Sequence, residues 1–171
     1  MKHQPQVEGF TRQETLALTK ATPNQLFYLE KAGLVIPTRI GSNKRPTVIF
    51  SWEQILEIRT IRELRKETSL QSIRKVVEYL NDNGFTDHLR DKQLIVLDES
   101  VFWVTTDWHD LPTNMTKVLR VANKGGKGVG QYMLTVLPPF SEIIDDLWNT
   151  AKSSSVIDFE SFKARAKVKA A

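Results

Sequence analysis

The chain has 171 residues, of which 40% are hydrophobic and 26% are charged, a composition typical of globular proteins with one or two small domains. It contains no cysteine, which excludes disulfides, thiolate metal sites and cysteine nucleophiles. No apolar run approaches the roughly 18 residues that a membrane span requires, and the first ten residues lack the apolar stretch of a secretory signal.

The formal net charge of +4 lies entirely in the first half of the chain. Residues 1–90 carry 14 Lys and Arg against 10 Asp and Glu, whereas residues 91–171 carry 10 of each kind. Nine basic residues and only four glutamates fall within residues 36–75. This local excess indicates a polyanionic partner, with a solvated basic surface as the alternative.

Four capping boxes, each with Ser or Thr three residues before Glu or Gln, predict helix starts in the first 81 residues. They begin at Thr11, Thr22, Ser51 and Thr68. We therefore expect helices over residues 12–19, 23–32, 52–66 and 69–81. Pro23 suits the first turn of the second helix, and Gly33 suits the position just beyond its end. Apolar residues at helical spacing in the third and fourth helices predict core packing.

The first two helices are short and closely connected, which is typical of a helix-turn-helix whose second helix enters the DNA major groove. Between the second and third helices, Val35–Ile36 and residues 48–50 favour a β-hairpin. Its tip would carry Arg39, Lys44 and Arg45. A basic hairpin beside a helix-turn-helix is typical of a wing, which contacts phosphates or a minor groove.

The stretch TPNQLFYLEKAGLVIPTR resembles the N-terminal domain of MerR-family transcription regulators. The positions in register with the family pattern are Leu26, Tyr28, Glu30, Gly33, Leu34, Pro37 and Arg39. The similarity continues through Arg45 in the wing and the third and fourth helices, so that it covers residues 10–80. The sequence departs from the family at several positions. Phe27 replaces an arginine that contacts phosphate, Leu29 replaces a tyrosine, Asn43-Lys44 replace Gly-Tyr in the wing, and about three extra residues precede Phe50. Asn81-Asp82-Asn83-Gly84 ends the fourth helix where the long dimerisation helix would follow.

Position in this arrangement predicts the DNA-contacting residues. Asn24 and Gln25 begin the second helix, where an amide can pair with adenine; an exposed helix start without a partner is the alternative. Tyr28 matches the family's phosphate-binding tyrosine, with simple packing as its alternative. The full predicted set is Thr11, Thr22, Asn24, Gln25, Tyr28, Arg39, Asn43, Lys44 and Arg45.

The second half predicts a small α+β module. Residues 94–106 favour a hairpin around 98–100, and residues 117–121 and 131–137 favour two further strands. Residues 140–148 favour a helix with one wide apolar face, which must pack on the small sheet or on a second copy. Asp158 suits the start of a final helix, followed by a basic tail.

The segment NKGGKGVG at 123–130 has the glycine spacing of a phosphate-binding P-loop. However, Gln131 and Tyr132 stand where Lys and Ser or Thr are required, and a strand follows instead of a helix. We expect this segment to be a flexible basic hairpin loop. The polar cluster at 107–110 favours a turn over a metal site, and no nucleophile motif or carboxylate pair indicates an enzyme.

The expected fold class is α+β, with three segments. A winged helix-turn-helix with four helices and a hairpin occupies residues 8–82, and a module of four antiparallel strands and one or two helices occupies 90–150. A short linker and a basic C-terminal helix or tail occupy 151–171. The expected function is transcriptional regulation by a cytoplasmic, nucleoid-associated homodimer that binds double-stranded DNA without a cofactor or metal. Segment 90–150 is expected to dimerise or to bind a protein or small ligand. The alternatives are a plasmid or phage segregation or architectural protein, an antitoxin-like adaptor, and a ligand-binding enzyme.

Overall fold

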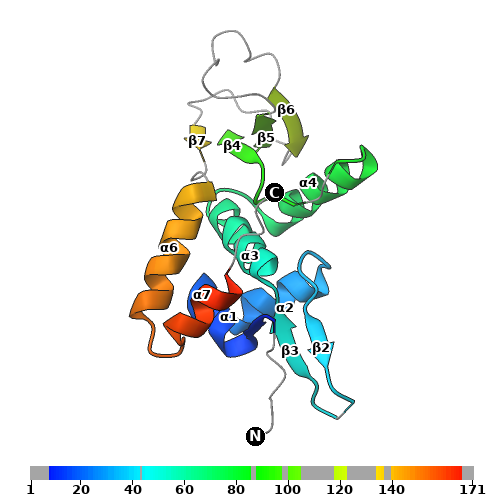
Figure 1. Ribbon diagram of the computed structural model, residues 1–171. Coiled ribbons are helices and arrows are strands. Elements are labelled where there is room, and N and C mark those ends of the chain that lie inside the picture. The colour runs from blue at the N-terminus through cyan, green and yellow to red at the C-terminus, as the bar shows by residue number, and fades with distance from the viewer. Residues whose placement is uncertain are drawn as a thin grey trace, which may run out of the picture. The chain divides into compact units, whose positions relative to one another are not determined.

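The computed structural model describes residues 8–42, 44–85, 88–97, 100–104, 118–122, 134–136 and 140–166 (Figure 1). Within these ranges it contains six helices and two antiparallel sheets, so the α+β class is confirmed. Contacts divide the chain into a terminal unit, formed by Met1–Arg59 and Ile143–Ala171, and a central unit, Thr60–Glu142. In the described part of the chain, no helix has the length and apolar character required to span a membrane.

The terminal unit is built from both ends of the chain. Its elements are β1 (Phe10–Thr11), α1 (Arg12–Thr19), α2 (Pro23–Lys31), β2 (Thr38–Ile40), β3 (Thr47–Phe50), the first part of α3 (Trp52–Arg65), most of α6 (Phe140–Ser153) and α7 (Phe159–Arg165). In the three-stranded sheet, β3 lies between β1 and β2. The four helix bounds predicted in the first half agree with the structure to within one residue at nearly every end.

The first strand of the hairpin starts three residues later than the sequence indicated, whereas the second strand, β3, includes the predicted residues 48–50. The first strand is β2 rather than Val35–Ile36, with Arg39 opposite Val48 and Thr38 opposite Ile49. Val35 is buried instead, and Pro37 has no backbone N–H with which to extend the ladder. Arg39 therefore lies in a strand and not at the hairpin tip.

The short strand β1 was not predicted. It pairs with β3 through Phe10 opposite Phe50, and Gly9 precedes it. A Cβ atom at Gly9 would lie 2.4 Å from Ile49 Cγ2 and 2.8 Å from the Phe50 carbonyl oxygen. Only glycine therefore allows the chain to approach β3 this closely.

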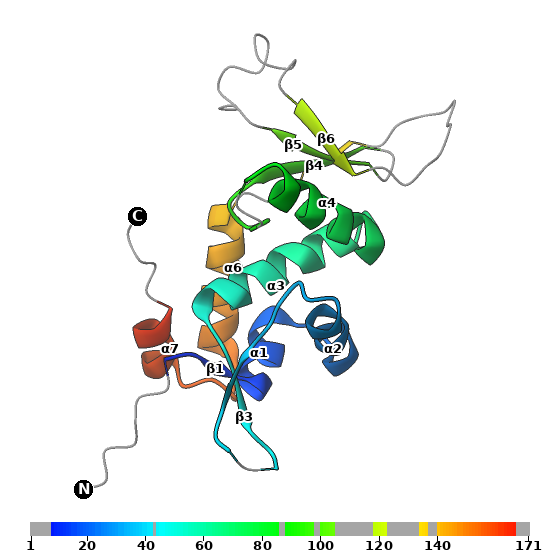
Figure 2. The ribbon, with the colours of Figure 1, turned by 90° about the vertical axis from the view of Figure 1, so that its right-hand side faces the viewer.

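The C-terminal helices complete the core of the terminal unit, as Figure 2 shows for α7 beside β1. Phe162 of α7 is fully buried. Its ring centroid lies 5.9 Å from that of Phe10, 5.7 Å from Trp52 and 5.1 Å from Trp148. Such tilted and edge-to-face arrangements are favourable for aromatic rings. Residues 143–166 thus pack with the N-terminal elements. The final helix predicted to start at Asp158 is present as α7, with Asp158 as its N-cap.

The central unit contains the last part of α3, α4 (Leu70–Asp82) and a second sheet. The strands of that sheet are β4 (Gln93–Leu97), β5 (Ser100–Val104), β6 (Val118–Ala122) and β7 (Leu134–Val136). Helix α4 packs against β5 and β6. Its N-cap is Ser69, whose hydroxyl accepts a hydrogen bond from the Ser72 backbone N–H. The predicted N-cap, Thr68, was wrong by one residue. Thr68 is buried.

The strand order of the second sheet is β6-β5-β4-β7. The predicted hairpin between β6 and β7 is therefore wrong, because these two strands lie at opposite edges of the sheet. The segment at 123–130 that connects them lies outside the described residues, as does the polar cluster at 107–110.

Replacement of Phe162 by alanine tests whether α7 belongs to the core. We expect F162A to lower the free energy of unfolding by about 3–5 kcal/mol, because it opens a cavity among three aromatic rings. The exposed neighbour Ser161 provides the control, and S161A should change the stability by less than about 0.5 kcal/mol. Urea denaturation followed by tryptophan fluorescence measures both values. A loss below about 1 kcal/mol for F162A would show that α7 does not support the core.

Candidate nucleic-acid interface

The start of α2 is held by a reciprocal capping box. The Thr22 hydroxyl accepts from the Gln25 backbone N–H at 3.2 Å, and Gln25 Oε1 accepts from the Thr22 backbone N–H at 2.9 Å. The sequence predicted this box, and the structure confirms it. Its consequence is that the oxygen of Gln25 is already engaged. A bidentate contact with adenine needs both the oxygen and the nitrogen of an amide, so Asn24 is the better candidate for that role.

The outward face of α2 combines polar and aromatic side chains. Asn24, Phe27, Tyr28 and Lys31 are all exposed, at helical spacings that place them on one face. Phe27 is 53% exposed and Tyr28 is 56% exposed, with their ring centroids 5.8 Å apart. Helix α2 packs on the core through Leu26 and Leu29 instead, so packing does not account for Tyr28. Sequence reasoning did not select Phe27 or Lys31, although their spacing from Asn24 pointed to the same face.

The end of α2 is equally well defined. Gly33 has φ +71° and its backbone N–H donates to the Glu30 carbonyl, while the Leu34 N–H donates to the Leu29 carbonyl. This paired arrangement is a Schellman motif, in which glycine accepts the left-handed conformation without strain. The predicted glycine position at the end of the second helix is confirmed.

The carboxylate of Glu30 joins α2 to two other elements. It accepts a hydrogen bond from Arg12 Nη1 of α1 at 2.8 Å and one from Arg39 Nη2 of β2 at 3.4 Å. The Glu30 side chain is only 14% exposed, whereas that of Arg39 is 53% exposed. Arg39 can therefore turn part of its guanidinium outward while it also fixes the base of the hairpin. Neither Arg12 nor Glu30 was predicted to organise this surface.

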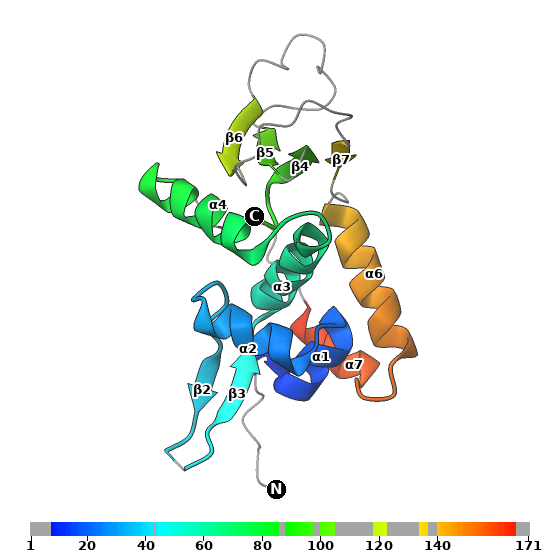
Figure 3. The same cartoon turned by 180° about the vertical axis from the view of Figure 1, so that it is seen from behind.

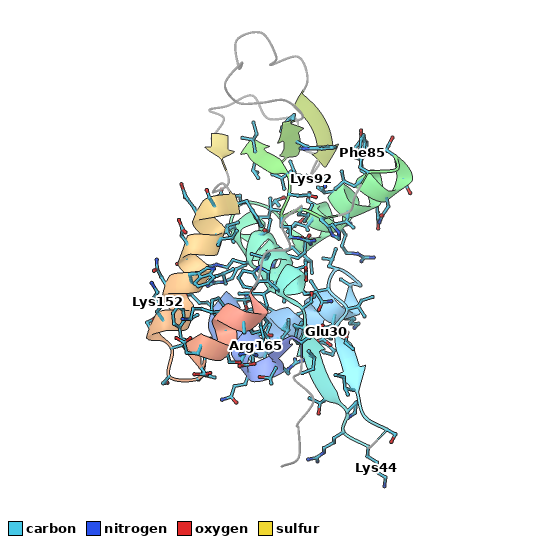
Figure 4. All side chains as sticks on the ribbon, in the orientation of Figure 1. Glu30, Lys44, Phe85, Lys92, Lys152 and Arg165 are labelled. Carbon is cyan, nitrogen blue, oxygen red and sulfur yellow. The ribbon has the colours of Figure 1, made fainter. Side chains whose placement is uncertain are left out.

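The hairpin loop carries two exposed cations, Lys44 and Arg45. Figure 4 shows Lys44 at the outer end of the loop and Glu30 near its base. Gly41, with φ +101°, begins the turn that separates the two strands. Asn43, which the sequence also selected, lies outside the described residues.

Helix α3 anchors the other side of the hairpin. Ser51 and Gln54 form a capping box, with the Ser51 hydroxyl accepting from the Gln54 N–H at 3.1 Å. Gln54 Nε2 also donates to the Ile36 carbonyl at 2.6 Å. The segment that leads into β2 is thus fixed to the start of α3. Figure 3 shows α2 beside the β2–β3 hairpin within the terminal unit.

Thr11 lies at the start of α1 and forms the predicted capping box with Glu14. Arg165 of α7 makes two hydrogen bonds to the Glu14 carboxylate, both at 2.8 Å, and a third to the Gly9 carbonyl at 2.9 Å. The exposed Thr11 is thus on a helix end that the C-terminal helix holds in place. Its hydroxyl accepts the Glu14 N–H and retains its own proton for a further bond.

The pKa of Glu14 reports on this contact. Burial raises the pKa of its carboxyl group, but hydrogen bonds from Arg165 and from the Thr11 backbone, together with the charge of Arg165, outweigh that effect. The pKa of Glu14 consequently lies below the usual range for glutamate. Ionised Glu14 therefore stabilises the folded terminal unit.

The turn between α1 and α2 is fixed from α6. Lys20 ends α1 in a left-handed conformation, and Asp146 pairs with both Lys20 and Arg59. Arg59 also donates to the Thr19 carbonyl at 3.4 Å. The basic side chain of Arg59 thus approaches the C-terminal end of α1, where the helix dipole favours a cation. The turn that connects the two helices is therefore held by side chains from α3 and α6.

All the predicted residues that the structure describes are exposed and belong to the terminal unit. Thr22 caps α2, while Asn24, Gln25 and Tyr28 lie on α2, and Arg39 of β2 is joined to α2 through Glu30. Lys44 and Arg45 extend from the same hairpin, and Thr11 lies at the start of α1. No cluster of three His, Asp or Glu residues suited to a metal ion occurs in the part of the chain that the structure describes.

Comparison with known protein families finds no family that matches this chain, and no characterised protein is significantly similar to it. The resemblance of residues 10–80 to MerR-family regulators stays a prediction from the residues themselves.

The Glu14–Arg165 contact predicts how stability changes with pH. A carboxyl with a lowered folded-state pKa contributes stability above its unfolded pKa of about 4.5, and that contribution is lost as the pH falls through the folded pKa. We expect R165Q to be less stable than the original chain at pH 6, and the difference to shrink towards pH 3. Urea denaturation at pH 6, 4.5 and 3 measures it.

The exposed residue Lys31 supplies the matched control, since K31Q removes one positive charge without touching Glu14. The difference in free energy of unfolding between K31Q and the original chain should not become smaller between pH 6 and pH 3. A difference for R165Q that stays constant from pH 6 to pH 3 would contradict the role assigned to the ionised carboxylate.

Proposed function

We propose that this chain is a sequence-specific double-stranded DNA-binding protein that regulates transcription. Helix α2 enters the major groove, and the β2–β3 hairpin acts as a wing on the backbone or in the adjacent minor groove. The observation that carries this proposal is the exposed face of α2, joined through Glu30 to a hairpin with exposed cations at its loop. The resemblance to MerR-family regulators supports the same arrangement.

The chemistry of the surface matches the parts of a DNA duplex. Asn24 offers an amide to base edges at the start of the helix, where recognition helices make their contacts. Lys44, Arg45 and the exposed part of Arg39 offer cations to phosphates. Tyr28 and Thr22 offer hydroxyl groups at the flanks. Phosphate contacts set the register of the protein, whereas the base contacts carry the specificity.

Rigid support of the surface also favours a DNA-reading role. Both ends of α2 are capped by specific hydrogen bonds, and its orientation towards α1 and β2 depends on one largely buried carboxylate. A site whose side chains are held in advance loses less conformational entropy on binding. An α-helix of nine residues reads few base pairs, so we propose that the protein acts as a homodimer on two half-sites. A cytoplasmic location is part of the same proposal.

Selection of bound sequences from a pool of random duplexes tests this function. We expect an inverted repeat to be enriched, and N24A to weaken its binding by about 1–3 kcal/mol through loss of a base contact. Asn149, an exposed asparagine of α6, provides the control, and N149A should bind as the original chain does. Fluorescence anisotropy measures each affinity. Failure to enrich any sequence would exclude site-specific recognition.

The salt dependence of binding tests the wing. Each phosphate contact that is removed should reduce the slope of log affinity against log salt by about one unit. We expect this reduction for R45A but not for K152A, which removes an exposed lysine from α6. Equal slopes for the two variants would contradict a wing contact. The genomic position of the selected sites separates promoter control from a segregation role, for which repeats would cluster near an origin.

A further inference from the structure

Among the exposed side chains of Asn24, Phe27, Tyr28 and Lys31 on α2, only that of Phe27 has no polar atom. Its ring is 53% exposed, although Leu26 at 0% and Leu29 at 6% already supply the packing of this helix. Its aromatic neighbour Tyr28 has a hydroxyl group that can reach a phosphate, whereas Phe27 can make only apolar and ring contacts. The two rings are exposed together, with their centroids 5.8 Å apart, and an exposed aromatic pair is a stronger candidate for a binding contact than a single exposed apolar residue.

The surroundings of Phe27 favour a nucleic-acid partner over a protein partner. The side chains that share its face are the amide of Asn24, the phenol of Tyr28 and the ammonium of Lys31. The acidic residue of α2, Glu30, is turned inward and is engaged by Arg12 and Arg39. The face therefore presents an apolar ring within polar and cationic groups, without an exposed carboxylate on that helix.

The edges of base pairs in the major groove offer one apolar group, the 5-methyl group of thymine. Phe27 follows Asn24 by three positions, which corresponds to about 4.5 Å along the helix axis. Successive base pairs are about 3.4 Å apart. A ring at this position therefore reaches a base pair one or two steps from the one that Asn24 contacts.

We propose that Phe27 is a specificity-determining residue that contacts a thymine methyl group, one or two base pairs from the base read by Asn24. This inference rests on the proposed function and adds a defined base to it.

Substitution of deoxyuridine for thymine tests the contact, because uracil has the same hydrogen-bonding edge without the methyl group. The probe is the strongest duplex selected with the original chain, in which each thymine is replaced in turn. We expect one replacement in each half-site to weaken binding about fourfold, as burial of one methyl group predicts. Fluorescence anisotropy provides the dissociation constants.

The variant F27A should bind the thymine and uracil duplexes equally, whereas F27L should keep part of the discrimination. Ile36, which is 69% exposed and lies outside α2, supplies the matched apolar control. I36A should discriminate thymine from uracil as the original chain does. Circular dichroism of F27A confirms that this surface change leaves the fold intact.

The outcomes separate the two proposals. If no duplex is selected, the proposed function fails and the inference fails with it. If a duplex is selected but no uracil replacement weakens binding, or if F27A still discriminates, the DNA-binding function stands and the role of Phe27 is overturned. The contact is established if F27A binds the thymine and uracil duplexes equally while I36A still prefers thymine.

Discussion

The carboxylate of Glu30 is the interaction on which the proposed DNA-reading surface depends. It lies largely out of water and receives hydrogen bonds from Arg12 of α1 and Arg39 of β2. A buried charge is costly unless it is paired, so the native position of Glu30 requires both elements to be in place. The packing of α2 against α1 and the approach of the hairpin to α2 therefore both depend on this carboxylate, while Asp146 and Arg59 fix the turn between the two helices. The positions of the exposed side chains on α2 and the hairpin, such as Asn24 and Lys44, therefore depend on the Glu30 contacts.

A second constraint acts from the far end of the chain. The Arg165 guanidinium binds Glu14 and Gly9, and it lies 4.4 Å from the centroid of the Phe10 ring. Together with Phe162, it closes the core over the start of α1. The exposed reading surface and the C-terminal helices thus belong to one compact unit, although more than 130 residues separate Tyr28 from Phe162 in the sequence.

Local interactions explain why much of this fold could be predicted from the sequence. The boxes at Thr11, Thr22 and Ser51 join residues only three positions apart, so the sequence contains both partners side by side. The glycine at the end of α2 and the aspartate cap of α7 are local in the same sense. The exposed positions of Asn24 and Tyr28 follow from helical spacing once the helix bounds are known.

Interactions between distant residues explain what could not be predicted. β1 exists because Phe10 meets Phe50, and the pairing of Glu30 with Arg39 depends on where the hairpin begins. Likewise, the edge positions of β6 and β7 depend on the whole strand order rather than on the sequence between them. At α4, two adjacent hydroxyl residues, Thr68 and Ser69, both offered an N-cap, and burial of the first decided between them.

The location of Phe162 in the core has a consequence for biosynthesis. A ribosome releases α2 and the β2–β3 hairpin long before it reaches α7, so Phe162, the partner of Phe10 and Trp52, is still missing when those elements leave the exit tunnel. Contacts between residues so far apart in sequence form late and close a large loop. The central unit, which is continuous in the sequence, can fold during this interval. The nascent chain would therefore complete the core that supports α2 and the hairpin only after α7 has been synthesised.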